Sequence, residues 1–175
     1  AQAIKVTYSY RVNNTGAVQT KVVTSPSVPA GASTTFFTPA NGLPNGAVGS
    51  ATVEGVGGGN IAVIVNDETF TLNPNRVAAY TCFPSTAATT KIALPLYKEF
   101  YFGDTSGIQV QNVGNAAANI SVTYFPPSGG SVKFTQNNVA AGASATFYNA
   151  SGSSAVSGNP GSLLQTAGGV VVEAN

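Results

Sequence analysis

The chain contains one sequence pattern twice, and this duplication limits the folds that it can adopt. Residues 4–8 read Ile-Lys-Val-Thr-Tyr, and residues 120–124 read Ile-Ser-Val-Thr-Tyr. A second block follows each of them, Val-Pro-Ala-Gly-Ala-Ser-Thr-Thr-Phe-Phe at 28–37 and Val-Ala-Ala-Gly-Ala-Ser-Ala-Thr-Phe-Tyr at 139–148. Because the order and the residue types agree, we interpret the chain as a tandem of two related units.

The two copies match further downstream but are cut at different points. Two more pairs of segments correspond: Gly49-Ser50 with Gly161-Ser162, and Ala62–Val65 with Val170–Val172. The second copy has a lead-in, Leu94–Asn119, that the first copy lacks. The first copy continues past its valine run through Asn66–Phe83, whereas the second copy ends at Asn175. Each copy therefore lacks a strand that the other has.

These matches divide the chain into two modules. We expect module 1 over residues 1–83 without its lead strand, a short linker over 84–90, and module 2 over 91–175 without its trailing strand. The linker is short enough that the modules should touch. Either the two modules complete each other, or strands come from a neighbouring molecule.

The residue patterns predict strands rather than helices. Apolar residues alternate along the first strand at Ile4, Val6, Tyr8, Tyr10 and Val12, which is typical of a half-buried strand. Asn13-Asn14-Thr15-Gly16 after it is a predicted turn. Gly, Pro or Asn separate most of the further short strands, and no segment has a helical apolar period. These strands include Ser33–Thr38, Ile61–Asn66, Val77–Phe83, Ile92–Phe102 and Ser162–Thr166. We therefore predict an all-β fold of two antiparallel β-sandwich modules, immunoglobulin-like or jelly-roll in type, related by internal duplication.

Low charge excludes several classes of partner. Charged residues make up 7% of the chain, against about 25% in ordinary globular proteins, and the net charge is +1. Nucleic acid has no basic stripe to bind, no apolar run reaches the roughly 18 residues of a membrane span, and weak net charge permits self-association. The Thr/Asn/Gly-rich composition and the start without Met favour a mature secreted product with its signal peptide removed.

The chemistry of the side chains argues against an enzyme. There is no histidine, which removes the commonest general base and zinc ligand, and only two of the six carboxylates, Asp67 and Glu68, are neighbours. Neighbouring residues on a strand point to opposite faces, so this pair is poorly placed for acid–base work. We predict no catalytic residue, no metal site and no cofactor. Cys82, the only cysteine, is expected to be a buried structural residue.

Two sets of surface residues are candidates for function. Asn13, Asn119 and Asn149 begin Asn-x-Ser/Thr triplets and are candidate glycosylation sites, although this composition produces about that many triplets by chance. The other set is a candidate subunit interface at the two ends of the chain: Ile4, Val6, Tyr8 and Tyr10, with Val170, Val171 and Val172. If module 1 lacks its lead strand, an apolar groove or open edge is left beside Tyr8 and Tyr10, and bare edges tend to associate.

Several segments resemble a known family of repeats. They are Leu94-Pro-Leu, Asp104–Gly114, Val139–Tyr148 and Gly161-Ser162, with Val28–Phe37, Pro39–Pro44, Gly49-Ser50 and Val63–Asn66 in the first copy. The pattern resembles the tandem immunoglobulin-like repeats of secreted bacterial cell-surface and filament proteins. The resemblance implies an extracellular structural role and carries no catalytic residues.

Together these features predict a structural subunit of an extracellular fibre, a pilus-like filament or a surface layer. Its partner would be itself, in a head-to-tail homopolymer formed by β-strand exchange or complementation. Two alternatives remain open. One is a non-catalytic adhesin module that binds glycans or cell surfaces through the aromatic residues at 97–102 or the loop at 39–46. The other is a viral coat protein, since paired jelly rolls suit this composition.

Overall fold

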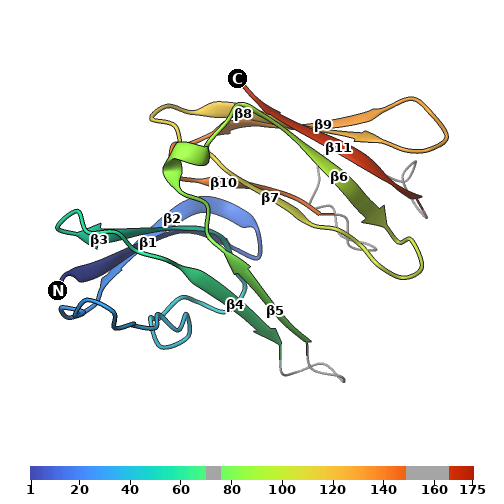
Figure 1. Ribbon diagram of the computed structural model, residues 1–175. Coiled ribbons are helices and arrows are strands. Elements are labelled where there is room, and N and C mark those ends of the chain that lie inside the picture. The colour runs from blue at the N-terminus through green and yellow to red at the C-terminus, as the bar shows by residue number, and fades with distance from the viewer. Residues whose placement is uncertain (70–75, 149–165) are drawn as a thin grey trace.

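All regular elements are β-strands except for one short 3-10 helix, η1 (Ser85–Ala87), in the computed structural model, which describes residues 1–69, 76–148 and 166–175. The paired strands run antiparallel. The all-β class and the antiparallel sheets expected from the sequence are therefore confirmed. Figure 1 shows the two halves of the chain as separate groups of strands, joined by the segment that contains η1.

The first half forms a three-stranded sheet with its N-terminal strand in the middle. The order is β2-β1-β3, from Thr15–Thr24 (β2), Ala3–Val12 (β1) and Ala47–Val56 (β3). Successive side chains of a strand point to opposite faces, and on β1 the buried ones are Val6, Tyr8 and Tyr10. The loop after β2 packs the half-buried side chains of Phe36 and Leu43 against them. This small core holds the first half together.

A two-residue turn connects the first two strands. Asn13 and Asn14 lie between the paired residues Val12 and Thr15, with φ values of 50° and 57°. Asn tolerates this left-handed conformation, and a turn with two positive φ values matches the twist of the strands on either side. The Thr15 hydroxyl also donates a hydrogen bond of 3.0 Å to the Val12 carbonyl. The local sequence therefore determines the β1–β2 hairpin.

A second hairpin of the first half is separate from this sheet. It consists of β4 (Ile64–Thr69) and β5 (Arg76–Thr81), which form a two-stranded sheet of their own. In Figure 1 the hairpin projects downward from the junction of the two halves. Among the described strands, β4 and β5 pair only with each other.

The second half has two layers. One is a four-stranded sheet, β6-β11-β8-β9, from Lys91–Glu99 (β6), Thr166–Ala174 (β11), Ala118–Phe125 (β8) and Val132–Val139 (β9). The other is the pair β10-β7, from Ser144–Phe147 (β10) and Ile108–Gln111 (β7). Buried residues from all six strands share one core, which includes Tyr97, Val122, Phe147 and Val170. The second half is thus β-sandwich-like.

The two halves share one hairpin but differ beyond it. Residues 4–8 lie on β1 and residues 120–124 on β8. Each of these strands is an interior strand of its sheet and pairs with the next strand along the chain. Both bury the valine and the tyrosine of the shared pattern. The two valine runs occupy different places in the sheets. Val170–Val172 lies on β11, which pairs with β8. The run of the first copy reaches into β4, but the strand that pairs with β1 is β3. The structural correspondence described here is therefore limited to these two hairpins, and the duplication stays an interpretation of the sequence.

One predicted strand is wrong and another is wrong in part. Residues 33–38 form no strand, and the strand expected over 92–102 ends at Glu99. The second difference has a local reason, since Phe100 and Phe102 have φ values of 48° and 52°, which extended backbone does not adopt. The predicted strand at Ser162–Thr166 lies almost entirely outside the described residues.

Polar side chains connect the two halves. The Ser50 hydroxyl donates to the Gly142 carbonyl at 3.3 Å, and the Gln111 amide donates to the Thr52 hydroxyl at 3.3 Å. Gln109 also donates to the carbonyl of Gly49, at 3.4 Å. The face of β3 therefore lies against β7 and the turn before β10. Because these bonds are long and partly exposed, each contributes little to stability.

Candidate assembly surfaces

The candidate interface residues of the N-terminal strand lie inside the first half. Val6, Tyr8 and Tyr10 are buried and Ile4 is half-buried, while β2 and β3 occupy both hydrogen-bonding edges of β1. The Asn41 amide donates to the Tyr8 hydroxyl at 3.2 Å. The open edge expected beside Tyr8 and Tyr10 is thus filled by the chain's own strands. The role of these residues in a subunit contact stays a prediction.

The candidate residues near the C-terminus are also enclosed. Val170 and Val172 are buried in the core of the second half, and Val171 is half-buried. Their strand, β11, lies between β6 and β8 and pairs with both. A partner strand therefore has no free edge of β11 to pair with in this arrangement, and the predicted contact remains untested.

Two of the three candidate glycosylation sites are accessible. Asn13 is exposed in the β1–β2 turn, and Asn119 is exposed near the start of β8. The Asn119 side-chain oxygen accepts a hydrogen bond of 3.1 Å from the backbone N–H of Asn138. Asn149 lies outside the described residues. Exposure permits modification of the first two and does not establish it.

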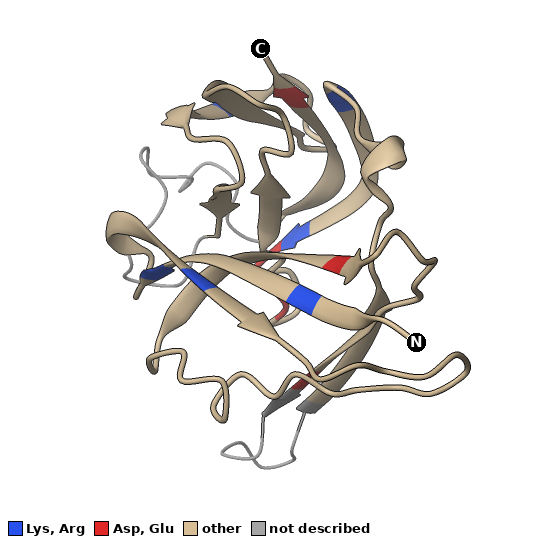
Figure 2. Ribbon diagram, turned by 90° about the vertical axis from the view of Figure 1, so that its left-hand side faces the viewer, with Lys and Arg blue, Asp and Glu red and all other residues tan. Residues whose placement is uncertain are grey.

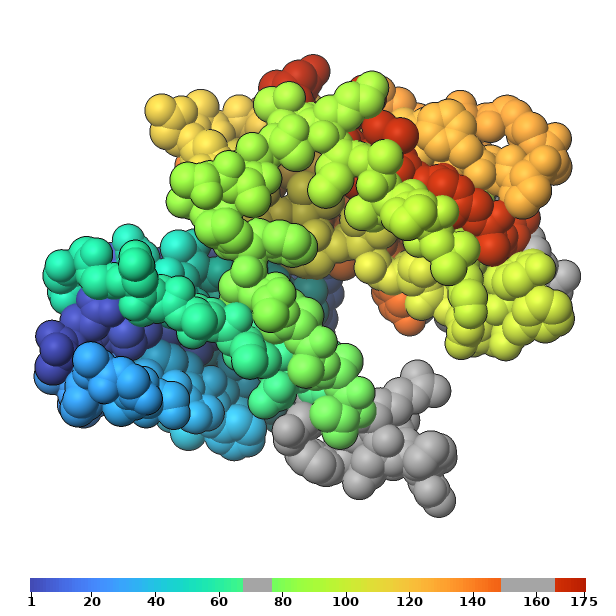
Figure 3. All heavy atoms as spheres, viewed as in Figure 1, coloured from blue at the N-terminus to red at the C-terminus, as the bar shows by residue number. Residues whose placement is uncertain are grey.

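An accessible apolar surface lies on the β4–β5 hairpin, which the sequence patterns did not single out. Ile64 is 69% exposed, Val77 67% and Phe83, just beyond β5, 89%. Ile64 lies opposite Thr81, and because opposed residues point to the same side, Ile64, Val77 and Ala79 share one face. Figure 3 shows β5 in green at the surface, with no other part of the chain over it in that view. A shallow depression on this hairpin is lined by Ile64, Ala79, Tyr80, Thr81 and Phe83.

The opposite face of the hairpin carries the cysteine. Cys82 is exposed, so the prediction of a buried structural cysteine is wrong. The strand around it is apolar as expected, but no second layer covers it within the described residues. Partial burial, then the proximity of Cys82 and of Asp67, raises the pKa of the Tyr80 hydroxyl. The side chains of Asp67, Tyr80 and Cys82 therefore lie on one face of the hairpin, opposite the face that carries Ile64.

The aromatic segment at 97–102 is split between the core and the surface. Tyr97 is buried and packs edge-on against Tyr124, with ring centroids 5.0 Å apart. Phe102 is 90% exposed, and its ring contacts that of Tyr101 edge-on at 4.6 Å. A tight turn, in which Tyr101 and Asp104 exchange backbone hydrogen bonds of 3.1 Å, presents the two exposed rings.

In the described part of the chain, charged residues occur as isolated pairs or singly and do not gather into a patch. Lys5 pairs with Glu54 across β1 and β3 at 2.6 Å, and Lys91 pairs with Glu173 across β6 and β11 at 2.8 Å. The hydrogen bond from Lys91, followed by its charge, lowers the pKa of the Glu173 carboxyl. Figure 2 shows the coloured residues scattered over the ribbon rather than gathered into a stripe. Exposed pairs of this kind contribute little to stability.

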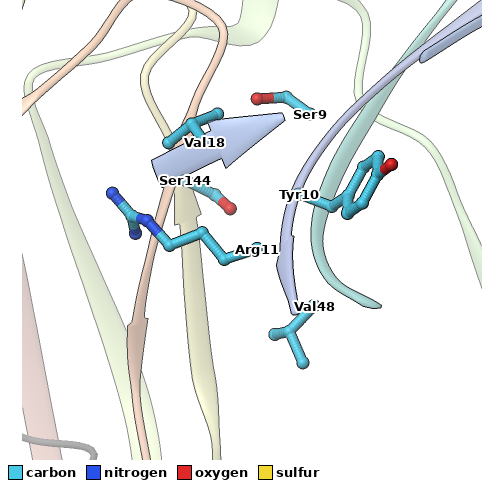
Figure 4. A pocket seen from close by; sticks show the side chains of 6 residues that line it. All are labelled: Ser9, Tyr10, Arg11, Val18, Val48 and Ser144. Carbon is cyan, nitrogen blue, oxygen red and sulfur yellow. The ribbon is translucent and has the colours of Figure 1, made fainter. Parts of the chain in front are cut away.

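The crevice between the halves cannot hold a ligand. Figure 4 shows the residues that line it: Ser9, Tyr10, Arg11, Val18, Val48 and Ser144. The space that they enclose is too small for a water molecule. In the described part of the chain, no three His, Cys, Asp or Glu side chains lie close enough together to hold a metal ion. Among the same residues there is no helix with the length and apolar character needed to span a membrane.

Comparison of the chain with protein-family models, with curated proteins and with solved structures found no match in any of the three. The resemblance to tandem immunoglobulin-like repeats thus remains an interpretation of the sequence. We therefore infer a function from which strands are buried and which are exposed.

Proposed function

We propose that the protein is a structural subunit of an extracellular fibre, a pilus-like filament or a surface layer. In this proposal copies of the chain associate head to tail through exposed β-structure. Support comes from the very low charge, from the internal duplication with unequal ends, and above all from the exposed apolar hairpin β4–β5.

The hairpin is the main support for the proposal, because its two strands lack the further strands or packed face that a stable sheet requires. A two-stranded hairpin is marginally stable in water on its own, and three or more strands or a packed face are usually required. Here Ile64, Val77 and Phe83 are all exposed, and β4 and β5 pair with no third strand among the described residues. Large exposed apolar surfaces and bare strand edges are typical of interaction sites. A neighbouring subunit would cover this surface and extend the sheet.

In this proposal the contact between subunits is heterologous rather than self-complementary. One subunit would present the hairpin, and the next would contact it with a different surface. Such a heterologous contact generates an open filament unless the rotation between subunits closes a ring. The low net charge provides little repulsion between copies.

A sedimentation-velocity experiment tests the proposal. The wild-type chain should form species larger than a monomer as its concentration rises, and the double variant Ile64→Ser/Phe83→Ser should stay monomeric because the apolar contact is lost. Phe102→Ser is the matched control, since it removes an equally exposed phenylalanine from another loop and should assemble like wild type. Equal assembly of wild type and the hairpin variant would overturn the proposal.

A second candidate function, adhesion to a glycan surface, is favoured by the exposed pair Tyr101 and Phe102. Aromatic rings at a loop tip are suited to stacking on sugar rings. In this alternative the chain stays monomeric, and Tyr101→Ala and Phe102→Ala abolish binding to a glycan array. Binding that these two variants leave unchanged would remove the alternative.

A further inference from the structure

The same sequence pattern adopts two conformations in the two halves. Residues 28–37 and 139–148 share Val-x-Ala-Gly-Ala-Ser-x-Thr-Phe and end in Phe37 and Tyr148, respectively. In the second half Ser144–Phe147 is the strand β10, whereas the matching residues 33–36 form no strand. Since the local sequence is nearly the same, the cause of this difference is tertiary.

The second half shows what the pattern requires to become a strand. There β10 pairs with β7 in a register that sets Ser144 opposite Gln111 and Phe147 opposite Ile108. The β7 strand supplies backbone partners along β10, and the backbone N–H of Asn112 donates to the Ala143 carbonyl at 2.9 Å. With β7 in place, Ala145 and Phe147 are completely buried.

In the first half this partner is missing. Ala32, Ser33 and Thr34 are exposed, although their counterparts Ala143, Ser144 and Ala145 are buried. Phe36 is half-buried against the first core. In the described part of the chain, no strand lies beside residues 33–36, and no backbone hydrogen bond involves them. The segment is therefore an unpaired edge beside an apolar core.

We propose that residues 32–37 are an acceptor for one extended strand of the β7 type. The register of β10 and β7, transferred to the first half, sets an aliphatic residue opposite Phe36 and a polar one opposite Ser33. This inference rests on the proposed function, because it names the kind of strand that a partner in the assembly adds.

The occupant is an uncharged segment with aliphatic residues at alternate positions, as in Ile108-Gln109-Val110-Gln111. Neither residues 28–37 nor this strand contain a charged residue, so no charge loses its hydration when they pair. Backbone hydrogen bonds would supply affinity, and the alternate apolar side chains would supply specificity by entering the core beside Phe36.

A peptide-binding experiment tests this acceptor in the full chain. The probe is a fluorescently labelled peptide with the sequence of residues 105–114, Thr-Ser-Gly-Ile-Gln-Val-Gln-Asn-Val-Gly. The matched control peptide has Asp in place of its Ile and its first Val. We expect saturable binding by fluorescence anisotropy, and binding at least about tenfold weaker for the control, because charges would have to enter the core.

A variant and a second measurement locate the bound peptide. Thr34→Pro removes a backbone N–H that, in the register of β10 and β7, would bond to the added strand, in a segment with no backbone hydrogen bonds to lose. It should abolish binding while the circular dichroism spectrum stays unchanged. Hydrogen exchange should show new protection at residues 33–36. Absence of binding, equal binding by Thr34→Pro, or protection confined to 144–147 would overturn the acceptor.

The two proposals fail separately. If the wild-type chain assembles through its hairpin but does not bind the peptide, the acceptor is wrong and the fibre proposal stands. If the peptide binds while the chain stays monomeric at every concentration, the acceptor stands and the fibre proposal is wrong. Protection of residues 33–36 that rises with protein concentration alone would support both proposals, because it would show that a strand of a second copy fills the acceptor.

Discussion

Two phenylalanines at matching positions of the repeat differ in burial, and their truncation should reveal the difference. Phe147 is completely buried, so Phe147→Ala should lower the free energy of unfolding by about 3–5 kcal/mol. Phe36 is half-buried, and Phe36→Ala should cost roughly half as much. Urea denaturation of both variants measures these values. Equal costs would mean that residues 33–36 pack as fully as β10.

The raised pKa of Tyr124 predicts that the folded protein loses stability at high pH. Burial, then the carboxylate of Glu99 and the neighbouring Tyr97, raises the pKa of its hydroxyl from 10.0 to about 12. The folded state therefore holds the proton more tightly than the unfolded state. This stabilisation is complete below pH 10 and is lost as the pH rises through 12, at up to about 1.4 kcal/mol per pH unit.

Urea denaturation at pH 8, 10, 11 and 12 checks this, with Tyr124→Phe as the control. The variant cannot ionise at this position, so its stability should fall less between pH 10 and 12 than that of wild type. Tyrosines away from this site contribute equally to both proteins, so the difference between the two curves reports the ionisation of Tyr124 together with its coupling to Tyr97. Parallel curves would contradict the assignment.

At the scale of elements, strand patterns were predictable where they depend on local sequence. Alternation along residues 4–12 predicted β1, and the Asn-Asn-Thr-Gly sequence after it predicted the hairpin turn. Residues 33–38 were predicted wrongly because a strand needs a partner, and the partner of β10 comes from a segment with no counterpart beside residues 33–36. Sequence pattern identifies a strand-forming segment, but tertiary pairing decides whether the strand forms.

The exposure of the hairpin was not predictable for a similar reason. Ile61–Asn66 and Val77–Phe83 read as strands that end the first module, and apolar strands of this kind normally enter a core. Whether a second layer covers them depends on where the rest of the chain goes. The candidate interface was therefore placed on β1 and β11, whose apolar residues fill the cores of the two halves.

The rate at which a thiol on the hairpin reacts measures whether assembly covers the hairpin. In the dispersed protein the Cys82 thiol is exposed, so Ellman's reagent should titrate one thiol per chain without denaturant. Assembly through the Ile64 face need not cover this thiol, but the double variant Cys82→Ser/Val77→Cys places the thiol on the Ile64 face. The rate of its reaction should fall by about tenfold or more in the polymer, because a covered thiol reacts only after local opening. An unchanged rate in assembled material would show that the hairpin is not in the contact.

At the scale of the whole molecule, the two halves are unequal. The second half has two layers and a continuous core, while the first half has one sheet, a covering loop and a separate hairpin. Polar bonds such as Ser50 to Gly142 connect the halves, and contacts of this kind resemble transient interfaces more than a domain core. The stable second half would then serve as the rigid spacer of a fibre, and the open first half as the part that receives a neighbour.

Negative-stain electron microscopy of the wild-type chain, concentrated without denaturant, tests this account most directly. We predict filaments of regular width that lengthen as the protein concentration rises, because the hairpin and the surface that receives it are different and do not close on themselves. Closed shells would indicate a coat protein instead. Dispersed particles of single 17.5 kDa chains at every concentration would contradict the proposed assembly.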